Sequence, residues 1–281
     1  MARYALTDNE FKTIGSLITY SPARGRKPTK VREMFDGILW ILCSGAPWRD
    51  LPSHYPPYRS VYHRFRYYQK HGILEQVVEL LLQKASKNRK VQLTLVCVDG
   101  SYIRAHRHAA GAPKKNGEGE EGVDQALGRS RGGFTTKLHL ICDQRGNPIS
   151  FTLTAGNVND FAAFESCFAS FHERMERLSW QHRLVFLVAD KGYDARRIRK
   201  YCRRHGLVPM IPKRRNQQGQ QQRNRNFDKD MYKKRNIVER CLLWLKECRR
   251  VATRFEKLSA TYSAMVNMAT IRRLLRKVVA D

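Results

Sequence analysis

The sequence predicts an α/β protein in which a helical N-terminal part precedes a mixed sheet flanked by helices. Up to about residue 88, apolar residues recur at the spacing of amphipathic helices. From about residue 92, short continuous apolar runs of strand length alternate with longer helical stretches. The 281 residues are enough for one domain of ordinary size and a smaller appended module. We therefore expect two domains, 1–88 and 92–281.

Four helices are expected in the N-terminal part, at 7–17, from about 29 to 45, from about 60 to 70, and from 74 to about 85. The first begins with a capping box formed by Thr7 and Glu10. The third carries Arg64 and Arg66 among aromatic residues. Such a basic, aromatic helix favours a helix-turn-helix-like DNA-binding module with both arginines as DNA contacts. A plain helical bundle with aromatic core residues gives the same pattern.

The second part contains strand-like and helix-like segments in the order β-β-β-α-β-α-β-α. The expected strands are 93–98, 135–143, 149–154, 184–189 and 207–211, and the expected helices are 161–177, 195–205 and 230–250. This is the element order of an RNase H-like domain. Two polar segments, 107–133 and 213–226, are expected to be basic loops that a partner would order.

The charge of the chain indicates a polyanionic partner. There are 53 Lys and Arg against 25 Asp and Glu, a net charge of +28. Nucleic acid is the favoured partner, because it relieves the self-repulsion of so basic a chain. A ribosomal-type RNA binder or a merely solubilising surface also explains the charge, whereas a membrane surface is disfavoured, since no basic amphipathic helix shows a wide apolar face.

The cysteine pattern and the lack of targeting segments favour a cytosolic protein. No apolar run approaches the roughly 20 residues of a membrane span, and the first residues do not form a signal peptide. The seven cysteines lack the paired spacing of a zinc site and are odd in number. We expect reduced, mostly buried thiols.

Two acids directly follow apolar strand runs: Asp99 after the first and Asp190 after the fourth. If these strands are neighbours, their carboxylates meet and repel unless divalent metal lies between them. Alternatively, each acid simply caps a turn, since Asp-Gly and Asp-Lys-Gly are good turn sequences. For either acid alone, the turn is the favoured interpretation.

A third acid lies on the last helix of this series. On a continuous helix over 230–250, Tyr232, Arg235, Glu239 and Lys246 project within an arc of about 60°. A salt-bridged surface helix is the alternative, because Arg235 and Glu239 are one turn apart. Residues 213–257 contain 15 Lys and Arg against 5 Asp and Glu, so a carboxylate here stays ionised beside a phosphate-binding surface.

Several motifs resemble the DDE transposases of the bacterial insertion sequence 5 family, within the wider insertion sequence 4 group. They are VDGSYIRAH, QALGRSRGGFTTKLHL, ADKGYDA and Y-x₂-R-x₃-E-x₆-K, with a softer match in the N-terminal segments PWRDLP and SVYHRFRYY. The resemblance covers nearly the whole chain. It implies a helical DNA-binding domain at 1–88 and an RNase H-like catalytic domain at 92–281.

The resemblance implies that Asp99, Asp190 and Glu239 bind two Mg²⁺ ions, with Mn²⁺ as a substitute, and cut and rejoin DNA. Arg235 and Lys246 would contact phosphates and Tyr232 a sugar or base, with Arg129 and Arg131 as further DNA contacts. His106 and His108 are expected to be loop or DNA contacts, because Mg²⁺ prefers oxygen ligands.

The implied partner is double-stranded DNA, both the terminal inverted repeats and the target. A homodimer or higher homo-oligomer is expected on that DNA, in the cytoplasm and on the nucleoid. Two rivals stay open: a nuclease or resolvase that only hydrolyses, and a domesticated, non-catalytic DNA-binding protein of the same fold.

Overall fold

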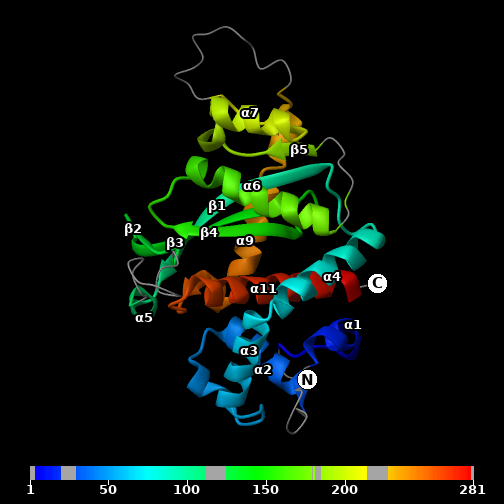
Figure 1. Cartoon of the computed structure of the whole chain (residues 1–281), viewed down its shortest axis with the longest axis vertical. Helices are drawn as coiled ribbons and strands as arrows, with labels where there is room; N and C mark the ends of the chain where they lie inside the picture. Colours follow the sequence, from blue (N-terminus) through cyan, green and yellow to red (C-terminus); the bar gives the residue numbers. More distant parts are fainter. Residues whose placement is uncertain are drawn as a thin grey trace. The chain divides into compact units, whose positions relative to one another are not determined.

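The computed structural model describes residues 4–19, 30–111, 125–178, 180, 185–213 and 227–279. Figure 1 shows the whole chain with its helices and strands labelled. The chain forms two compact units. Unit 1 comprises Met1–Ala85, Ala105–Gln125 and Leu245–Asp281, and unit 2 comprises Ser86–Arg104 and Ala126–Trp244. Each unit is therefore assembled from segments that are distant in the sequence.

Unit 1 is helical. Its elements are α1 (Asp8–Ile18), α2 (Val31–Ser44), η1 (Trp48–Asp50), α3 (Tyr58–Lys70), α4 (Ile73–Lys87), α5 (Arg107–Ala110), α10 (Arg249–Ala252), the short strand β7 (Thr253–Arg254) and α11 (Ser259–Val279). The predicted capping box at the start of α1 is confirmed: the Thr7 amide donates to Glu10 Oε2 at 2.8 Å, and the Glu10 amide donates to Thr7 Oγ1 at 3.2 Å.

The core of unit 1 forms around α11, which contacts α1, α2 and α3. One face of α11 is buried, and Met265, Met268 and Ile271 are fully covered. The compact units thus divide the chain differently from the expected division near residue 90. The C-terminal 37 residues join the N-terminal helices because the apolar face of α11 packs against them.

Unit 2 is built on a mixed sheet with the strand order β2-β3-β1-β5-β6, in which β4 pairs with β3 along the same edge as β2. The strands are β1 (Leu95–Ala105), β2 (Gly128–Ser130), β3 (Gly133–Asp143), β4 (Pro148–Ala155), β5 (Val185–Val188) and β6 (Leu207–Met210). The β1–β3–β4 meander is antiparallel, whereas β5 runs parallel to β1 and β6 parallel to β5. The expected mixed α/β class and chain order are confirmed.

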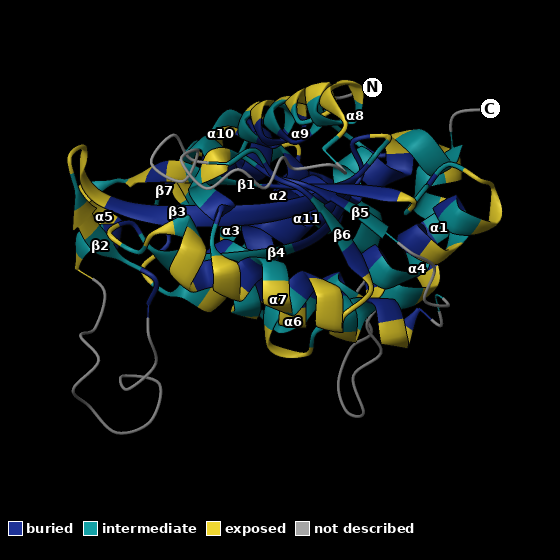
Figure 2. Cartoon of the chain, turned by 90° about the horizontal axis from the view of Figure 1, so that it is seen from above, coloured by how far each residue is buried: buried dark blue, intermediate teal, exposed yellow. Residues whose placement is uncertain are grey.

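Helices cover both faces of this sheet. Figure 2 shows α6 (Asp160–Arg177) and α7 (Arg196–Arg204) on one face, and α8 (Lys229–Lys233) and α9 (Asn236–Lys246) on the other. The sheet between them is buried, and the outer surfaces of α6 and α7 are exposed. Residues on the two faces of one strand therefore meet different helices, which determines the surroundings of the acids.

Three expectations about local structure are wrong. First, β1 does not end before Asp99 but continues to Ala105, because β3 pairs with it without interruption from Val96 to Arg104. The Asp-Gly pair thus lies inside a ladder and not in a turn.

Second, residues 230–250 do not form one helix. Lys234 and Arg235 form a turn between α8 and α9, and α9 ends at Lys246 before α10 begins. The amides of Lys234, Arg235, Ile237 and Val238 each bond a carbonyl three residues back, which tightens the chain locally and breaks the helical period. The arc calculated for a continuous helix therefore holds only within α9, for Glu239 and Lys246.

Third, the segment 107–133 is not wholly a loop. Its beginning forms α5, and β2 forms a hairpin with β3. The hairpin was not predicted because its glycine-rich composition is typical of a loop. Gly133 in this hairpin adopts the positive φ that glycine allows. The rest of this segment, 112–124, and nearly all of the second predicted loop, 214–226, lie outside the described residues.

The cysteine expectation is confirmed, since all seven are free thiols and all are buried. Among the described residues, no helix is long and apolar enough to span a membrane.

Candidate active site

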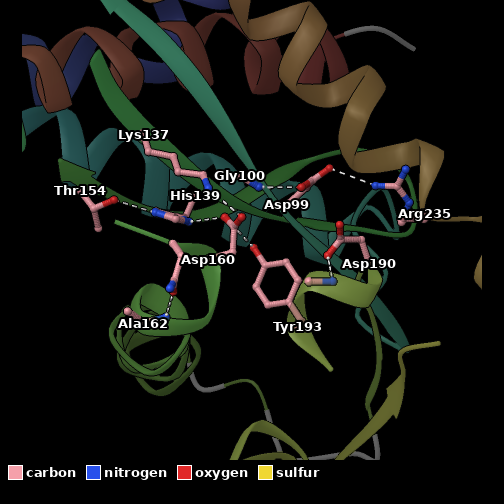
Figure 3. Close-up of polar contacts among 12 residues, drawn as sticks. Asp99, Gly100, Lys137, His139, Thr154, Asp160, Ala162, Asp190, Tyr193 and Arg235 are labelled. Atoms are coloured by element: carbon pink, nitrogen blue, oxygen red, sulfur yellow. Dashed lines mark hydrogen bonds and ion pairs between the residues drawn. The ribbon is translucent and has the colours of Figure 1, made fainter. Parts of the chain in front are cut away.

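Asp99 lies within β1, and Asp190 lies two residues beyond the end of the neighbouring parallel strand β5. The register of β1 and β5 pairs Cys97 with Val188, and each acid follows two residues later. Because neighbouring strands lie about 4.8 Å apart, the two carboxylates lie close to each other. Figure 3 shows Asp190 beside Asp99 and Arg235. The two acids that the sequence singled out are thus brought together.

Each aspartate is fixed by a local backbone amide. Asp99 Oδ1 accepts from the Gly100 amide at 2.8 Å, and Asp190 Oδ1 accepts from the Gly192 amide at 2.7 Å. Asp190 caps the short helix η3 (Lys191–Tyr193), so the turn interpretation is correct for its local geometry. Because only one oxygen of each carboxylate is held in this way, a capping role and a ligand role are compatible.

Arg235 joins Asp99 to the third acid. Its Nη1 donates to Asp99 Oδ2 at 3.2 Å, and its Nη2 donates to Glu239 Oε1. The arginine reaches both because it lies in the turn that precedes α9, while Glu239 lies in the first turn of that helix. One guanidinium therefore neutralises carboxylates from β1 and α9.

The pKa of Asp99 is raised above its ordinary value. Burial is the largest cause, while the Gly100 amide and Arg235 act in the opposite direction. The charges of Asp190 and Asp160 raise the pKa further. Asp99 is therefore a partly dehydrated carboxylate with acids close enough to repel it, and a cation at this place lowers its energy.

A second polar cluster adjoins Asp99 and was not found from the sequence. Lys137 Nζ donates to Asp160 Oδ2 at 2.7 Å, His139 Nδ1 lies 3.3 Å from Asp160 Oδ1, and the Tyr193 hydroxyl donates to the same oxygen at 3.4 Å. Burial alone would raise the pKa of Asp160, but the bonds from His139 and Lys137 lower it. The available signal was Lys-x-His in an apolar strand, which places both side chains on one face.

Gly100 is where this cluster meets the strand of Asp99. A Cβ at this position would lie 2.2 Å from Asp160 Oδ1 and 2.8 Å from Lys137 Cε. We expect Gly100→Ala to destabilise unit 2 by about 1–3 kcal/mol, the usual effect of overpacking a close-packed site. Urea unfolding measures this change. Gly132→Ala is the matched control, because the nearest atom there is 3.8 Å away, and equal stability of the two variants would contradict the crowding.

Among the described residues, no three His, Cys, Asp or Glu side chains lie together closely enough to hold a metal ion as they stand. Asp99 and Glu239 are instead linked through the guanidinium of Arg235.

Two family models match the chain. The first, described as a putative transposase of the IS4/5 family, matches residues 6–78, and the second, described as a transposase DDE domain, matches residues 91–274. The chain belongs to the DDE transposase family. The expected function, DNA transposition by a transposase of the insertion sequence 4/5 group, is thereby confirmed at the level of the family.

Two relatives are similar to parts of the chain, and the name of one agrees with this assignment. The chain is 32% identical over 134 residues to the putative transposase for insertion sequence element IS402 of Burkholderia cepacia, covering 47% of this chain and 59% of that protein. It is also 32% identical over 113 residues to the uncharacterized protein y4sN of Sinorhizobium fredii, covering 40% of this chain and 86% of that protein.

Among solved structures, the chain is similar to the Mos1 transposase paired-end complex with left transposon end, at 14% identity and a TM-score of 0.30 over 82% of each chain. The catalytic domain of Mos1 mariner transposase gives the same identity and TM-score, over 74% of this chain and 91% of that one. This likeness is distant, and the fold described above rests on the topology of the sheet.

The predicted DNA contacts of unit 2 differ in exposure. Arg129 and Arg131 are exposed in and beside β2, with Arg129 5.1 Å above the Phe134 ring. Tyr232 is half-buried, and its ring centroid lies 5.4 Å from that of Phe227. These side chains border solvent, as contacts to DNA require.

The predicted contacts of α3 require one correction. Arg64 is buried, with its guanidinium carbon 5.9 Å from the Tyr67 ring centroid and 5.8 Å from that of Tyr68, so it packs within the helices of unit 1 and does not offer its charge to DNA. Arg66 lies two residues later, about 200° round the helix, and is half-buried, with Nη1 donating to Thr261 Oγ1 at 2.9 Å. The sequence could not distinguish these neighbours because both lie among aromatic residues.

Proposed function

We propose that this transposase binds the ends of an insertion sequence and carries out cleavage and strand transfer at a site formed by Asp99, Asp190 and Glu239. One observation carries the proposal: Asp99 and Asp190 each follow, by two residues, the paired residues Cys97 and Val188 of adjacent parallel strands, and Arg235 bonds both Asp99 and Glu239. Two of the three acids, from separate elements, thus bond the same guanidinium, and the third follows the neighbouring strand.

The donor set fits two divalent ions. All three residues offer carboxylate oxygens, which Mg²⁺ and Mn²⁺ prefer, and their combined charge of about −3 leaves +1 against two dications to receive a phosphodiester. When bound, such ions activate the attacking oxygen and stabilise the leaving one. The ion pairs of Arg235 with Asp99 and Glu239 support the proposal that these two acids attract a cation.

Neighbouring residues position and neutralise the three acids. The amides of Gly100 and Gly192 hold Oδ1 of each aspartate, so that the other oxygen is directed to a ligand. Arg235 neutralises Asp99 and Glu239 and is proposed to exchange one carboxylate for a phosphate oxygen when DNA binds. The proposed cluster of Lys137, His139 and Asp160 supports the strand of Asp99 from the other face of the sheet.

Double-stranded DNA is the proposed substrate, both as terminal inverted repeats and as target. Lys246, Tyr232, Arg129 and Arg131 are the proposed contacts to it in the catalytic part, and Arg66 in the N-terminal helical part. We also propose a homodimer or higher oligomer on DNA, since two ends must be handled together, and action on DNA in the bacterial cytoplasm.

Lys246 is the last residue of α9 and lies on the same face of that helix as Glu239. Burial lowers the pKa of Lys246. We expect Lys246→Ala to weaken DNA binding and to reduce the slope of log affinity against log salt by about one, the loss of one phosphate contact. Filter binding between about 50 and 200 mM salt measures this slope. The control is Lys87→Ala, an exposed lysine at the end of α4, and equal slopes in both variants would remove Lys246 from the interface.

The proposed activity is tested with a linear duplex carrying the DNA that flanks the coding sequence, incubated with the protein, Mg²⁺ and a supercoiled plasmid. The expected products are a cut at the end of the element and its joining to the plasmid. A protein that cuts but never joins would be a hydrolysing nuclease, and one that binds without metal-dependent nicking would be a domesticated DNA-binding protein. Either result would overturn the proposal.

A further inference from the structure

Unit 1 contains a cavity of about 840 Å³ that the proposed cleavage chemistry does not use. It lies among η1, α3, α5 and the start of α11, and residues from all three chain segments of the unit line it. Ligand sites typically have volumes of about 300–1,000 Å³, so the space is large enough for a bound molecule.

Aromatic rings form one wall of the cavity. The Trp48 ring meets the Tyr62 ring edge-on at a centroid distance of 5.2 Å, and Phe255 lies 5.0 Å from His106. Trp48, Tyr62, His106 and Phe255 are all only partly buried, so their rings retain surface that a ligand can contact. A flat apolar ligand could stack on such a wall.

Positive charge surrounds these rings. Arg49, Arg107 and Lys257 line the cavity and are exposed. Among the described residues of the lining, the one acid is Glu256, and it is buried in an ion pair with Arg250 at 2.8 Å. The lining therefore holds a marked excess of cations over acids. Cations gathered at one concave site repel one another, and an anion relieves that repulsion.

Flat aromatic faces next to an excess of cations match the two halves of a nucleotide, a base and its phosphate. Base stacking on aromatic side chains together with phosphate binding by Arg and Lys is how proteins hold single-stranded nucleic acid. Within a duplex, both faces of an internal base are covered by its neighbours, so the aromatic wall can stack on such a base only when it is unpaired.

We propose that this cavity binds an unpaired nucleotide of the DNA substrate, with its base against Trp48, Tyr62 or Phe255 and its phosphates on Arg49, Arg107 and Lys257. This rests on the proposed function only in taking DNA as the polymer that supplies the nucleotide. The site lies in the N-terminal helical part, and it gives the transposase a means to recognise frayed, flapped or single-stranded ends that paired DNA does not offer.

The test is an equilibrium binding measurement by fluorescence anisotropy in EDTA, so that no cleavage takes part. The labelled probes are a blunt duplex and the same duplex with a short single-stranded extension. The wild-type protein should prefer the extended duplex by about tenfold, the usual effect of stacking one base. Tyr62→Leu, which keeps apolar volume but removes the ring, should abolish that preference and leave the affinity for the blunt duplex unchanged.

The charge half of the site is tested with Arg107→Gln and Lys257→Gln, both exposed positions where unfolding is not expected. They should each reduce the preference severalfold, whereas Lys12→Gln, exposed on α1 of the same unit, should not. Circular dichroism melting verifies that Tyr62→Leu is folded at the assay temperature.

Three outcomes would overturn the proposal. The wild-type protein could bind both duplexes equally, or Tyr62→Leu could lose the same factor of affinity for both duplexes. The third is that dAMP displaces the extended duplex fully when the two are present at equal concentration. The last would show a site for free nucleotides and not for DNA. Because Asp99, Asp190 and Glu239 are unchanged and metal is absent, this result does not depend on the proposed active site.

Discussion

Asp99→Asn, Asp190→Asn and Glu239→Gln are each expected to slow strand cleavage by about 10³-fold or more, while affinity for the DNA end stays within about threefold of wild type. Each substitution keeps the size of the side chain but removes the negative charge that holds a divalent cation. Cleavage rates with Mg²⁺ and affinities in EDTA measure the two effects separately.

The matched control is Asp230→Asn, a well-exposed acid of α8 paired with Lys233 at 2.8 Å. Its cleavage rate should equal that of the wild-type protein. If one of the three site variants retains cleavage, that residue does not belong to the active site, and the other two must act with a different partner.

Loss of folding does not explain the expected effect of Asp99→Asn. Burial raises the pKa of Asp99, so the folded state favours its protonated form. The stability contributed by this group is present at pH below the ordinary carboxyl value and is lost as the pH rises through the raised pKa. At neutral pH the ionised group destabilises the fold, with Arg235 opposing this, and a thermal melt in EDTA should show Asp99→Asn no less stable than wild type.

Arg235→Gln should have two opposite effects. We expect Mn²⁺ to bind about tenfold more tightly, because the guanidinium no longer competes for Asp99 and Glu239, and one unit charge at this range is worth about 1.4 kcal/mol. Cleavage should nevertheless slow by about 10²-fold, since the phosphate loses a charged donor. Calorimetric titration with Mn²⁺ and single-turnover cleavage measure the two quantities.

Arg235→Lys is the matched variant because it keeps the charge but cannot bond two carboxylates as a planar fork does. Its affinity for Mn²⁺ should lie near that of the wild-type protein, with cleavage only partly restored. If Arg235→Gln instead weakens Mn²⁺ binding, the arginine organises the acids and does not compete with the ions.

Much of the fold follows from the sequence because its apolar runs are strongly periodic. The five predicted strands of unit 2 begin and end within a few residues of their predicted positions, except that β1 continues through Asp99 and Gly100; the short strand β2 was not predicted. Local turn propensity favoured an end there, but a long ladder with β3 overrides it. The break at Lys234 and Arg235 was missed for a similar reason, since both residues are good helix formers.

The acids of the candidate site could be predicted from the sequence, whereas the residues that surround them could not. Asp99 and Asp190 could be paired from two strand runs alone, and their roles remain predictions. The contact of Asp160 with Lys137 and His139 depends on how α6 packs across the sheet, which no local pattern encodes. Likewise, the burial of Arg64 and the cavity of unit 1 arise from segments far apart in the chain.

Anomalous diffraction from crystals of the protein with end DNA and Mn²⁺ tests the central claim most directly. We predict two manganese peaks about 3.5–4 Å apart, with oxygen ligands from Asp99, Asp190 and Glu239, and with Arg235 moved from Asp99 to a phosphate. Manganese bound elsewhere, or bound without contact to these acids in crystals whose DNA is cleaved, would contradict the proposed active site.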